Sequence, residues 1–382
     1  MPSTLGIGDI GVYIPRLEVT LDTIIARHRQ QDPERAIPLE RAKRRTGQMS
    51  IRFPHSWEDT ATMAAQAATQ ILSRLDSTDI ASLRYLVVGT ETCIDQAKPV
   101  AAYVQGMLQR SGFPIAGAIS TFDIQHACAS GAIGLLSVGA LLNASGADGE
   151  RGLVICSDEA RYAPGSTAEV TQGAAAVAIL VEPAPRLLDI NLGDVGYSSR
   201  DVDDFFRPLG SVTAQVRGRY SLDCYRSAVE KSLLDLCART GRNLPQLLME
   251  TDLFALHVPF RLLPEETLTD LVQRYLGMDS AGSIAFLARR HFRSGTKPTA
   301  VVGNTYTGSL FLSLAALLAA RCRELQSAVV GERVTMAAYG SGSTALAFSG
   351  RVSRQAPAIV NRWCLDRALN HRQEASMADY DA

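Results

Sequence analysis

One stretch in the first half of the chain limits the possible folds more than any other. A short apolar and β-branched run over 118–124 leads into small residues over 126–131, and apolar residues then recur at helical spacing up to Leu142. This order predicts a buried strand, a tight turn and a helix, with Cys128 at the turn. A thiol there lies near the positive end of a helix dipole, which lowers its pKa and favours the nucleophilic thiolate. The alternative is a structural cysteine, because a free thiol packs like a small apolar group.

The remaining patterns predict an α/β fold with two similar halves. In the first half we predict strands over 6–15, 83–90, 152–156 and 174–181, and helices over 20–29, 57–75 and 96–108. In the second half we predict strands over 253–258, 299–302, 334–338 and 344–348, and a helix over 310–320. The order strand, small-residue turn, helix, strand, glycine turn, strand occurs in both halves, which indicates an internal duplication of architecture.

Size and charge narrow the function classes. A chain of 382 residues exceeds the usual size of a single core, and its 38 basic and 39 acidic residues leave no global field to attract nucleic acid or an acidic membrane. Seven cysteines without Cys-x-x-Cys spacing argue against a disulfide framework and a structural zinc site, and they favour a cytoplasmic location. We expect no signal peptide, since the N-terminus lacks a basic head and an apolar run, and no transmembrane segment, since Ser, Asn or Arg interrupt the apolar helices.

Several polar residues stand where ligands gather in α/β folds. Glu91 follows the strand over 83–90, and the carboxyl ends of strands are the usual place for a site, although a surface ion pair is the alternative. The chain over 158–173 is long, polar and rich in turn residues, as functional loops are. His257 belongs to a predicted strand and Asn304 to a small-residue turn, where the alternatives are a core histidine and a helix cap.

Taken together, these residues resemble the 3-hydroxy-3-methylglutaryl-CoA synthase family of the thiolase and ketosynthase III superfamily. The most specific motifs are His-Val-Pro-Phe at 257–260 and Gly-Asn-Thr-Tyr-Thr-Gly-Ser at 303–309, supported by Tyr-Gly-Ser-Gly-Ser at 339–343. The resemblance covers nearly the whole chain. It implies a five-layered α/β/α/β/α thiolase fold with halves at 1–185 and 186–382, assembled as a homodimer.

The resemblance also implies roles for the main candidates. Cys128 would take an acetyl group from a thioester, and Glu91 would remove a proton from the acetyl methyl group. The resulting enolate would add to the ketone of a 3-oxoacyl thioester, whose oxygen His257 would hydrogen-bond or protonate. Asn304 would orient this second substrate, and water would release the product from Cys128.

Further substrate-binding residues follow from the same resemblance. The backbone N–H groups of Cys128 and Ser343 would form an oxyanion hole, with Gly342 in the same turn, for which a plain hairpin glycine is the alternative. Tyr162 and Asp204 match pocket positions of the family, although each also suits an ordinary loop or sheet residue. We expect no metal and no bound cofactor. The substrates would be thioesters of CoA or of an acyl carrier protein.

Departures from the family pattern leave several functions open. Ala129 follows Cys128 where relatives carry an aromatic residue, and Glu265 and Glu266 stand where lysines help to hold the phosphates of CoA. The basic cluster over 27–45 is either a solvated face or a site for phosphates or an acidic carrier protein. We first expect aldol addition on a carrier-bound chain in polyketide-type metabolism. The alternatives are a mevalonate-pathway synthase, a ketosynthase III-like acyltransferase or decarboxylative condensing enzyme, and a non-catalytic scaffold subunit.

Overall fold

A computed structural model describes residues 5–145 and 149–381. Residues 1–4 lie outside these ranges, and the expectation of no signal peptide rests partly on them. Within them, a mixed sheet of nine strands crosses the molecule in the order β11-β12-β13-β8-β1-β7-β6-β4-β5. Its strands are β1 Leu5–Tyr13, β4 Leu83–Gly89, β5 Ser120–Ile124, β6 Arg151–Ala160, β7 Gly173–Pro183, β8 Leu188–Ser199, β11 Leu253–Leu256, β12 Arg333–Gly340 and β13 Thr344–Val352.

Helices surround and separate the two halves of this sheet. In the first half they are α1 Leu21–Gln31, α2 Pro33–Thr46, α3 Thr60–Leu72, α4 Ser77–Ala81, α5 Val100–Arg110 and α6 Ser130–Ser145. In the second half they are α7 Gly218–Arg239, α8 Leu244–Glu250, α9 Leu263–Leu276, α10 Ser280–Arg289, α11 Phe292–Thr296, α12 Thr299–Val302, α13 Ser309–Leu325, α14 Ala356–Val360, α15 Leu365–Asn370 and α16 Met377–Asp381.

Short elements complete the fold around one end of the sheet. The strands β2 Leu17–Thr20, β3 Ser50–Phe53 and β14 Gln373–Glu374 form a small second sheet, and β9 Phe205–Phe206 pairs with β10 Gln215–Val216. Three 3-10 turns are η1 Glu169–Thr171, η2 Tyr306–Gly308 and η3 Gln326–Val329.

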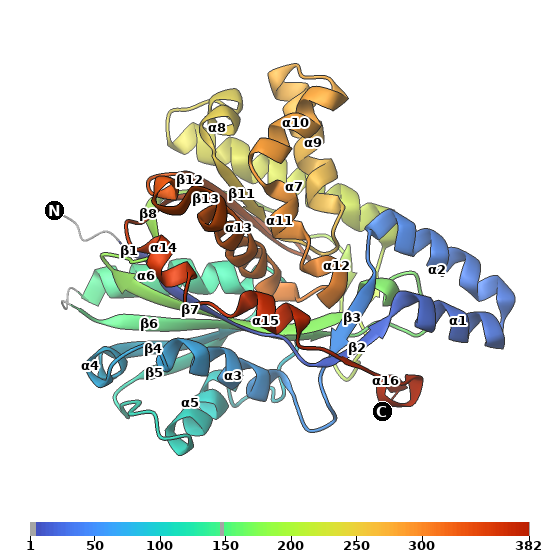
Figure 1. Ribbon diagram of the computed structural model, residues 1–382, viewed down its shortest axis with the longest axis horizontal. Coiled ribbons are helices and arrows are strands. Elements are labelled where there is room, and N and C mark those ends of the chain that lie inside the picture. Colours follow the sequence, from blue (N-terminus) through green and yellow to red (C-terminus); the bar gives the residue numbers. More distant parts are fainter. Residues whose placement is uncertain (1–4, 146–148, 382) are drawn as a thin grey trace.

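Three buried clusters show that the molecule has five layers (Figure 1). Apolar residues of α3 and α5 pack on the outer face of the first-half strands, and those of α7, α8 and α9 pack on the outer face of the second-half strands. Between them, α6 and α13 share one central cluster with the inner faces of both sets of strands. The predicted α/β/α/β/α thiolase-like arrangement is confirmed. The two halves are joined where β1 pairs antiparallel with β8, and the predicted boundary at residues 185 and 186 falls between β7 and β8.

The central helix α6 is unusually apolar. In the described part of the chain, the stretch Ala127–Ser145 is long and apolar enough to cross a membrane by length and composition alone, and 56% of it is buried inside the fold. Leu135 and Val138 on this helix lie in the central cluster between the two sets of strands. We therefore interpret α6 as a core helix whose composition reflects its burial between layers.

One predicted strand is a helix in the structure. Thr299, Val301 and Val302 suggested a strand, but residues 299–302 form the single turn α12. Pro298 begins this turn in the right-handed helical region, and Gly303, with φ at +91°, ends it. Because the turn packs mainly on β3 and also touches β7 without pairing with it, tertiary contacts outweigh the β propensity of its residues.

Candidate active site

The turn before α6 presents Cys128, as the sequence predicts. Ala127 has a positive φ of 41°, and the Ser130 hydroxyl donates to the Ala127 carbonyl at 2.7 Å while it accepts the His126 N–H at 2.7 Å. The first helical turn also needs Gly131, since a Cβ there would lie 2.3 Å from the sulfur of Cys156. These contacts fix the chain so that Cys128 opens to a cavity of about 370 Å³.

Glu91 lies directly behind the nucleophile. Its Oε1 accepts a hydrogen bond from the Cys128 thiol over 2.9 Å, and the side chain is only 5% exposed. Burial, followed by the charge of Asp158, raises the pKa of Glu91 to about 8, while the bond from the thiol and the charge of Arg207 oppose the shift. A carboxyl group in this state gains and loses a proton close to neutral pH, as a general base must.

The structure reverses the expected state of the resting thiol. Burial, together with the charge of Glu91, raises the pKa of Cys128 well above its usual value, so the expectation of a lowered pKa is wrong. The helix dipole is outweighed because a thiolate would form in a dry site beside a carboxylate. The proton can still pass from sulfur to Glu91 along their hydrogen bond, and this transfer leaves the net charge of the pair unchanged.

Asp158 is a functional candidate that the sequence analysis missed. Its Oδ1 accepts the Glu91 N–H at 2.9 Å and the hydroxyls of Thr90 and Thr92, while its Oδ2 accepts the N–H of Thr307 at 3.1 Å. This buried carboxylate therefore ties the segment that carries Glu91 to the second half of the chain. The sequence did contain one indication of Asp158. It lies in the polar run after the strand predicted over 152–156, and residues at the carboxyl ends of strands often belong to sites.

His257 follows β11 and is fixed on all sides. Its N–H donates to the Ala337 carbonyl at 2.8 Å, its carbonyl accepts the Tyr225 hydroxyl at 2.7 Å, and its Nδ1 lies 2.5 Å from Oγ of Ser309. The same Oγ accepts the N–H of Val258 at 3.1 Å. Burial lowers the pKa of His257 to about 3, so the imidazole is neutral near pH 7.

The tautomer of His257 follows from its partners. Since the oxygen of Ser309 already accepts from Val258, the hydroxyl hydrogen is best satisfied by donation to Nδ1. We infer that Nε2 then carries the proton and is the hydrogen-bond donor of the ring.

Four predicted residues from distant segments line the same cavity: Cys128, Tyr162, His257 and Asn304. The Oδ1 atom of Asn304 accepts the Tyr306 N–H at 2.9 Å, and the N–H of Asn304 donates to the Thr171 carbonyl at 2.9 Å. Burial raises the pKa of Tyr162, whose ring stands near Phe205 and whose hydroxyl neighbours that of Tyr306. Much of the remaining wall is apolar, with Phe205, Leu222, Tyr225, Phe260 and Leu263.

Four other predicted residues do not line the cavity: Glu91, which contacts it only through Cys128, and Asp204, Gly342 and Ser343. Asp204 is fully buried, and it accepts the Tyr339 hydroxyl at 2.7 Å and the Gly342 N–H at 2.9 Å, so it holds the turn between β12 and β13. The N–H of Ser343 donates to the Arg200 carbonyl at 2.6 Å. This donor is thus occupied, because the pairing of β13 with β8 continues past the strand ends, and the oxyanion role of Ser343 stays a prediction.

Ser341, from the same turn, is a cavity residue that the sequence analysis did not name. Across residues 5–145 and 149–381, no cluster of three or more His, Cys, Asp or Glu side chains is placed to hold a metal ion. The arrangement offers a nucleophilic sulfur and a neutral hydrogen-bond donor at one cavity, with a basic carboxyl group hydrogen-bonded to the sulfur.

Comparisons with known proteins agree with this chemistry. Residues 1–185 match the family model for the N-terminal part of hydroxymethylglutaryl-coenzyme A synthase, and residues 265–382 match the model for its C-terminal part. The hydroxymethylglutaryl-CoA synthase of Enterococcus faecalis is 28% identical over 380 residues, which span 99% of this chain and 91% of the relative. The mitochondrial enzyme of Bos taurus is 30% identical over 81% of this chain and 67% of the relative.

Solved structures are similar over the full length. MvaS in complex with 3-hydroxy-3-methylglutaryl coenzyme A has a TM-score of 0.84 and 31% identity, covering all of this chain and 91% of the other. The HMG synthase of the curacin biosynthetic pathway, in complex with acetyl donor-ACP, has a TM-score of 0.86 and 26% identity, covering 99% and 87%. Together with the family models, which cover well over half of the sequence, these matches show that the chain belongs to the hydroxymethylglutaryl-CoA synthase family of acyl-condensing enzymes.

Proposed function

We propose that Cys128, Glu91 and His257 catalyse the addition of an acetyl unit to the ketone of a 3-oxoacyl thioester. In the first step Glu91 takes the proton of Cys128, and the sulfur attacks the carbonyl carbon of the acetyl donor. A new carbon–sulfur bond forms to Cys128 as the donor's own carbon–sulfur bond breaks. The departing thiolate takes the proton from Glu91, which becomes a carboxylate again.

Carbon–carbon bond formation uses the same carboxylate. Glu91 removes a proton from the methyl group of the acetyl-enzyme, and the enolate attacks the ketone carbon of the acceptor. The Nε2–H of neutral His257 donates to the ketone oxygen and stabilises the alkoxide that forms there. That alkoxide takes up one proton, which balances the proton removed from the methyl group. Water then hydrolyses the bond to Cys128 and restores the thiol.

One observation carries this proposal: Cys128 and Glu91 share a hydrogen bond of 2.9 Å at the cavity that His257 and Asn304 also line. Burying a carboxyl group against a buried thiol costs folding free energy, and such pairs of perturbed groups cluster at functional sites. A non-catalytic scaffold has no need of this pair. We propose that Asn304 orients the acceptor beside His257, because its amide group lines the same wall.

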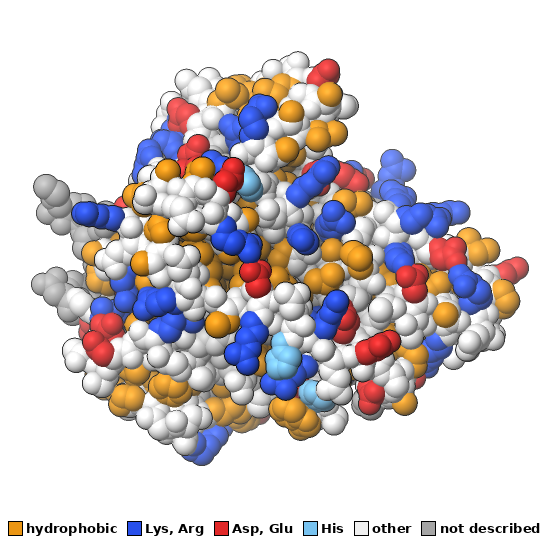
Figure 2. Space-filling model, in the orientation of Figure 1, with side chains coloured by type: hydrophobic (Ala, Val, Ile, Leu, Met, Phe, Trp, Pro, Cys, Tyr) orange, Lys and Arg blue, Asp and Glu red, His pale blue; other side chains and the backbone are white. Residues whose placement is uncertain are grey.

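The cavity rim supports recognition of an anionic carrier from the α2 side. Arg41 and Arg45 line the cavity, and with Arg44 they are exposed on α2, where Figure 2 shows Lys and Arg side chains gathered at the upper right. None of the three forms an ion pair with another residue in the described ranges. We propose that they meet the phosphate of a thioester carrier or the acidic surface of a carrier protein.

The two acids that depart from the family pattern are each paired with an arginine, and Glu266 also lines the cavity. Glu265 pairs with Arg293 at 2.7 Å, and Glu266 pairs with Arg226 at 2.8 Å. Their charge is thus partly balanced, which reduces the repulsion of a phosphate. Because the curacin-pathway HMG synthase was solved with a donor ACP, we propose a carrier-protein donor in a polyketide-type pathway. CoA thioesters of the mevalonate type are the second candidate, since MvaS was solved with 3-hydroxy-3-methylglutaryl coenzyme A.

Parallel assays with two donors separate these substrates. Acetyl-CoA and an acetyl carrier protein are each mixed with the enzyme and a 3-oxoacyl acceptor, and the product is identified by mass. The proposal expects a 3-hydroxy-3-methylglutaryl-type product that forms faster from the carrier protein. Arg41→Ala and Arg45→Ala should each slow its formation more than the control Arg35→Ala, which removes an arginine paired with Asp32. A decarboxylated product, or no product from either donor, contradicts it.

We also propose a homodimer. The strand β5 is at the free edge of the large sheet, and beside it α6 leaves Ile133 and Leu136 only half-buried and Leu141 exposed. An unpaired edge next to an apolar helix face is well suited to cover by a second copy of the chain. The cytoplasmic location stays a prediction.

A further inference from the structure

We propose that Tyr380, Gln172, Glu169 and His28 are positioning residues that fix the cavity wall facing the acceptor thioester. This inference rests on the proposed function. Its centre is the carboxylate of Glu169, which is only 1% exposed. That carboxylate accepts the Gly165 N–H at 2.6 Å and the Tyr380 hydroxyl at 3.2 Å, and it lies 2.9 Å from Nε2 of His28.

The cluster joins three parts of the chain that are far apart in sequence. His28 comes from α1, Glu169 and Gln172 from the loop before β7, and Tyr380 from α16, which lies near α1 and β2 in Figure 1. The ring of Tyr380 packs edge-on against Phe53 of β3 with centroids 5.6 Å apart. This packing brings its hydroxyl group into contact with the loop.

From Tyr380 the contacts lead directly to the cavity. The side-chain amide of Gln172 donates to the Tyr380 hydroxyl at 2.7 Å, and its Oε1 accepts the backbone N–H of Tyr162, a cavity residue, at 2.7 Å. Two hydrogen bonds therefore separate α16 from the backbone of Tyr162. Each polar atom of Gln172 has a defined partner, so the amide is held in one orientation.

The same loop fixes Asn304. The carbonyl of Thr171 accepts the Asn304 N–H at 2.9 Å, and Gly303 approaches Gln172 so closely that an added Cβ would lie 1.7 Å from the Gln172 carbonyl oxygen. A shift of Gln172 must therefore displace Asn304. The cluster thus acts on two wall residues, Tyr162 and Asn304. Cys128 packs beside Tyr162, but its own turn is fastened separately.

Cys128 and Glu91 are held by other groups. Ser130 fastens the turn at Cys128, and Asp158 fastens the segment that carries Glu91. A loosened cluster should therefore impair the step that needs the acceptor and leave acetylation of Cys128 intact. A merely structural role would lower both steps together.

The test is Tyr380→Phe, which keeps the ring on Phe53 and removes the hydroxyl. We expect kcat/KM for the 3-oxoacyl acceptor to fall about tenfold, as for loss of a buried hydrogen bond to a charged group, with a raised KM. The rate of acetyl-Cys128 formation should stay within about twofold of the wild type. Gln172→Leu should reproduce this split, and the double variant should be no worse than the more impaired single variant.

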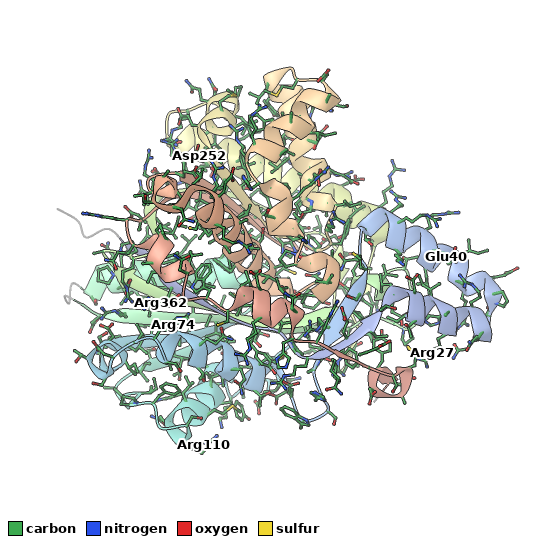
Figure 3. The ribbon with its side chains drawn as sticks, in the orientation of Figure 1. Arg27, Glu40, Arg74, Arg110, Asp252 and Arg362 are labelled. Carbon is green, nitrogen blue, oxygen red and sulfur yellow. The ribbon has the colours of Figure 1, made fainter. Side chains whose placement is uncertain are left out.

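The matched control is Asp381→Asn. Asp381 lies on the same short helix as Tyr380 and forms a 2.5 Å ion pair with Arg27 of α1, which Figure 3 labels. The substitution removes this ion pair and leaves the cluster intact, so both rates should be unchanged. Equal loss of both steps in Tyr380→Phe and Gln172→Leu, or no loss in either, overturns the inference. Failure of the wild type to form acetyl-Cys128 at all would instead overturn the proposed function.

Discussion

At the scale of single residues, the three proposed catalytic groups all favour their neutral forms. The thiol of Cys128, the carboxyl group of Glu91 and the imidazole of His257 are all pushed towards their uncharged forms by burial. Only the ionised fraction of Glu91 can then act as a base, in a buried place where its charge is weakly screened. The state of Glu91 should therefore set how the condensation responds to pH.

The first prediction concerns that pH dependence. With a pKa of about 8, Glu91 is about one-tenth ionised at pH 7 and half ionised at pH 8, so the rate of carbon–carbon bond formation should rise about fivefold over this interval. In the acetyl-enzyme the thiol no longer donates a hydrogen bond to Glu91. Because that bond lowers the pKa of Glu91, its loss shifts the rise in rate to higher pH. Single-turnover rates of acetyl-enzyme with a saturating acceptor measure it. A rate that is flat between pH 6 and 9 would argue against Glu91 as the base.

The second prediction concerns Ser309. Without its hydroxyl, His257 is no longer held with the proton on Nε2, so Ser309→Ala should slow condensation by about tenfold to a hundredfold with little change in acetylation of Cys128. Ser313→Ala on the same helix is the control, since the Ser313 hydroxyl is buried without a hydrogen-bond partner among the described groups. Equal effects of the two substitutions would remove Ser309 from the mechanism.

Sequence reasoning found most of these residues but not their states. It singled out Cys128, His257 and Asn304, which line one cavity in the structure, because each belongs to a short motif at the end of a predicted element. It could not give the thiol pKa, which depends on Glu91 from another segment, nor foresee that Arg200 takes the N–H of Ser343. These properties arise from contacts between distant parts of the chain.

At the scale of elements, the turn around α12 shows where local patterns fail. Its β-branched residues favour a strand, whereas Pro298 and Gly303 bound a helical turn that packs on β3. Gly303 is then needed twice, for its φ of +91° and for its contact with Gln172. The turn thereby delivers Asn304 to the cavity.

The third prediction compares two glycines with positive φ. Gly277→Ala places a Cβ in open space after α9 and should cost roughly 1–2 kcal/mol of unfolding free energy from backbone strain. Gly303→Ala adds a collision with the Gln172 carbonyl and should cost about 3 kcal/mol or more, together with most of the condensation rate. Denaturant unfolding monitored by fluorescence measures both. Similar losses for the two variants would mean that the contact at Gly303 relaxes freely.

At the scale of the whole molecule, the duplicated α/β architecture was predictable from repeated patterns, whereas the five layers were implied by the family resemblance. Apolar strands and amphipathic or largely apolar helices recur in the order that a duplicated α/β fold requires, and the central pair α6 and α13 is rich in apolar residues. What the patterns could not supply is the joining of the halves through β1 and β8 into one sheet. That pairing depends on register and not on composition.

The fourth prediction concerns assembly. If β5 and the half-buried face of α6 are covered by a second copy, sedimentation at micromolar concentration should give a mass twice the 41.1 kDa of one chain. A charge at an exposed apolar position of that face, Leu141→Glu, should weaken the dimer, whereas Leu209→Glu, a change at a fully exposed loop position, should not. A wild type that sediments at 41.1 kDa contradicts the homodimer.

The most direct measurement of the central claim is intact-protein mass spectrometry after incubation with an acetyl thioester, with and without a 3-oxoacyl acceptor. The wild type should gain one acetyl group at Cys128 and lose it when the acceptor is added, with release of the condensed product. Glu91→Gln should retain whatever acetyl group it acquires in the presence of acceptor, and Cys128→Ala should never be labelled. Labelling of Cys128→Ala equal to that of the wild type, or turnover by Glu91→Gln at the wild-type rate, would contradict the assignment of the nucleophile and the base.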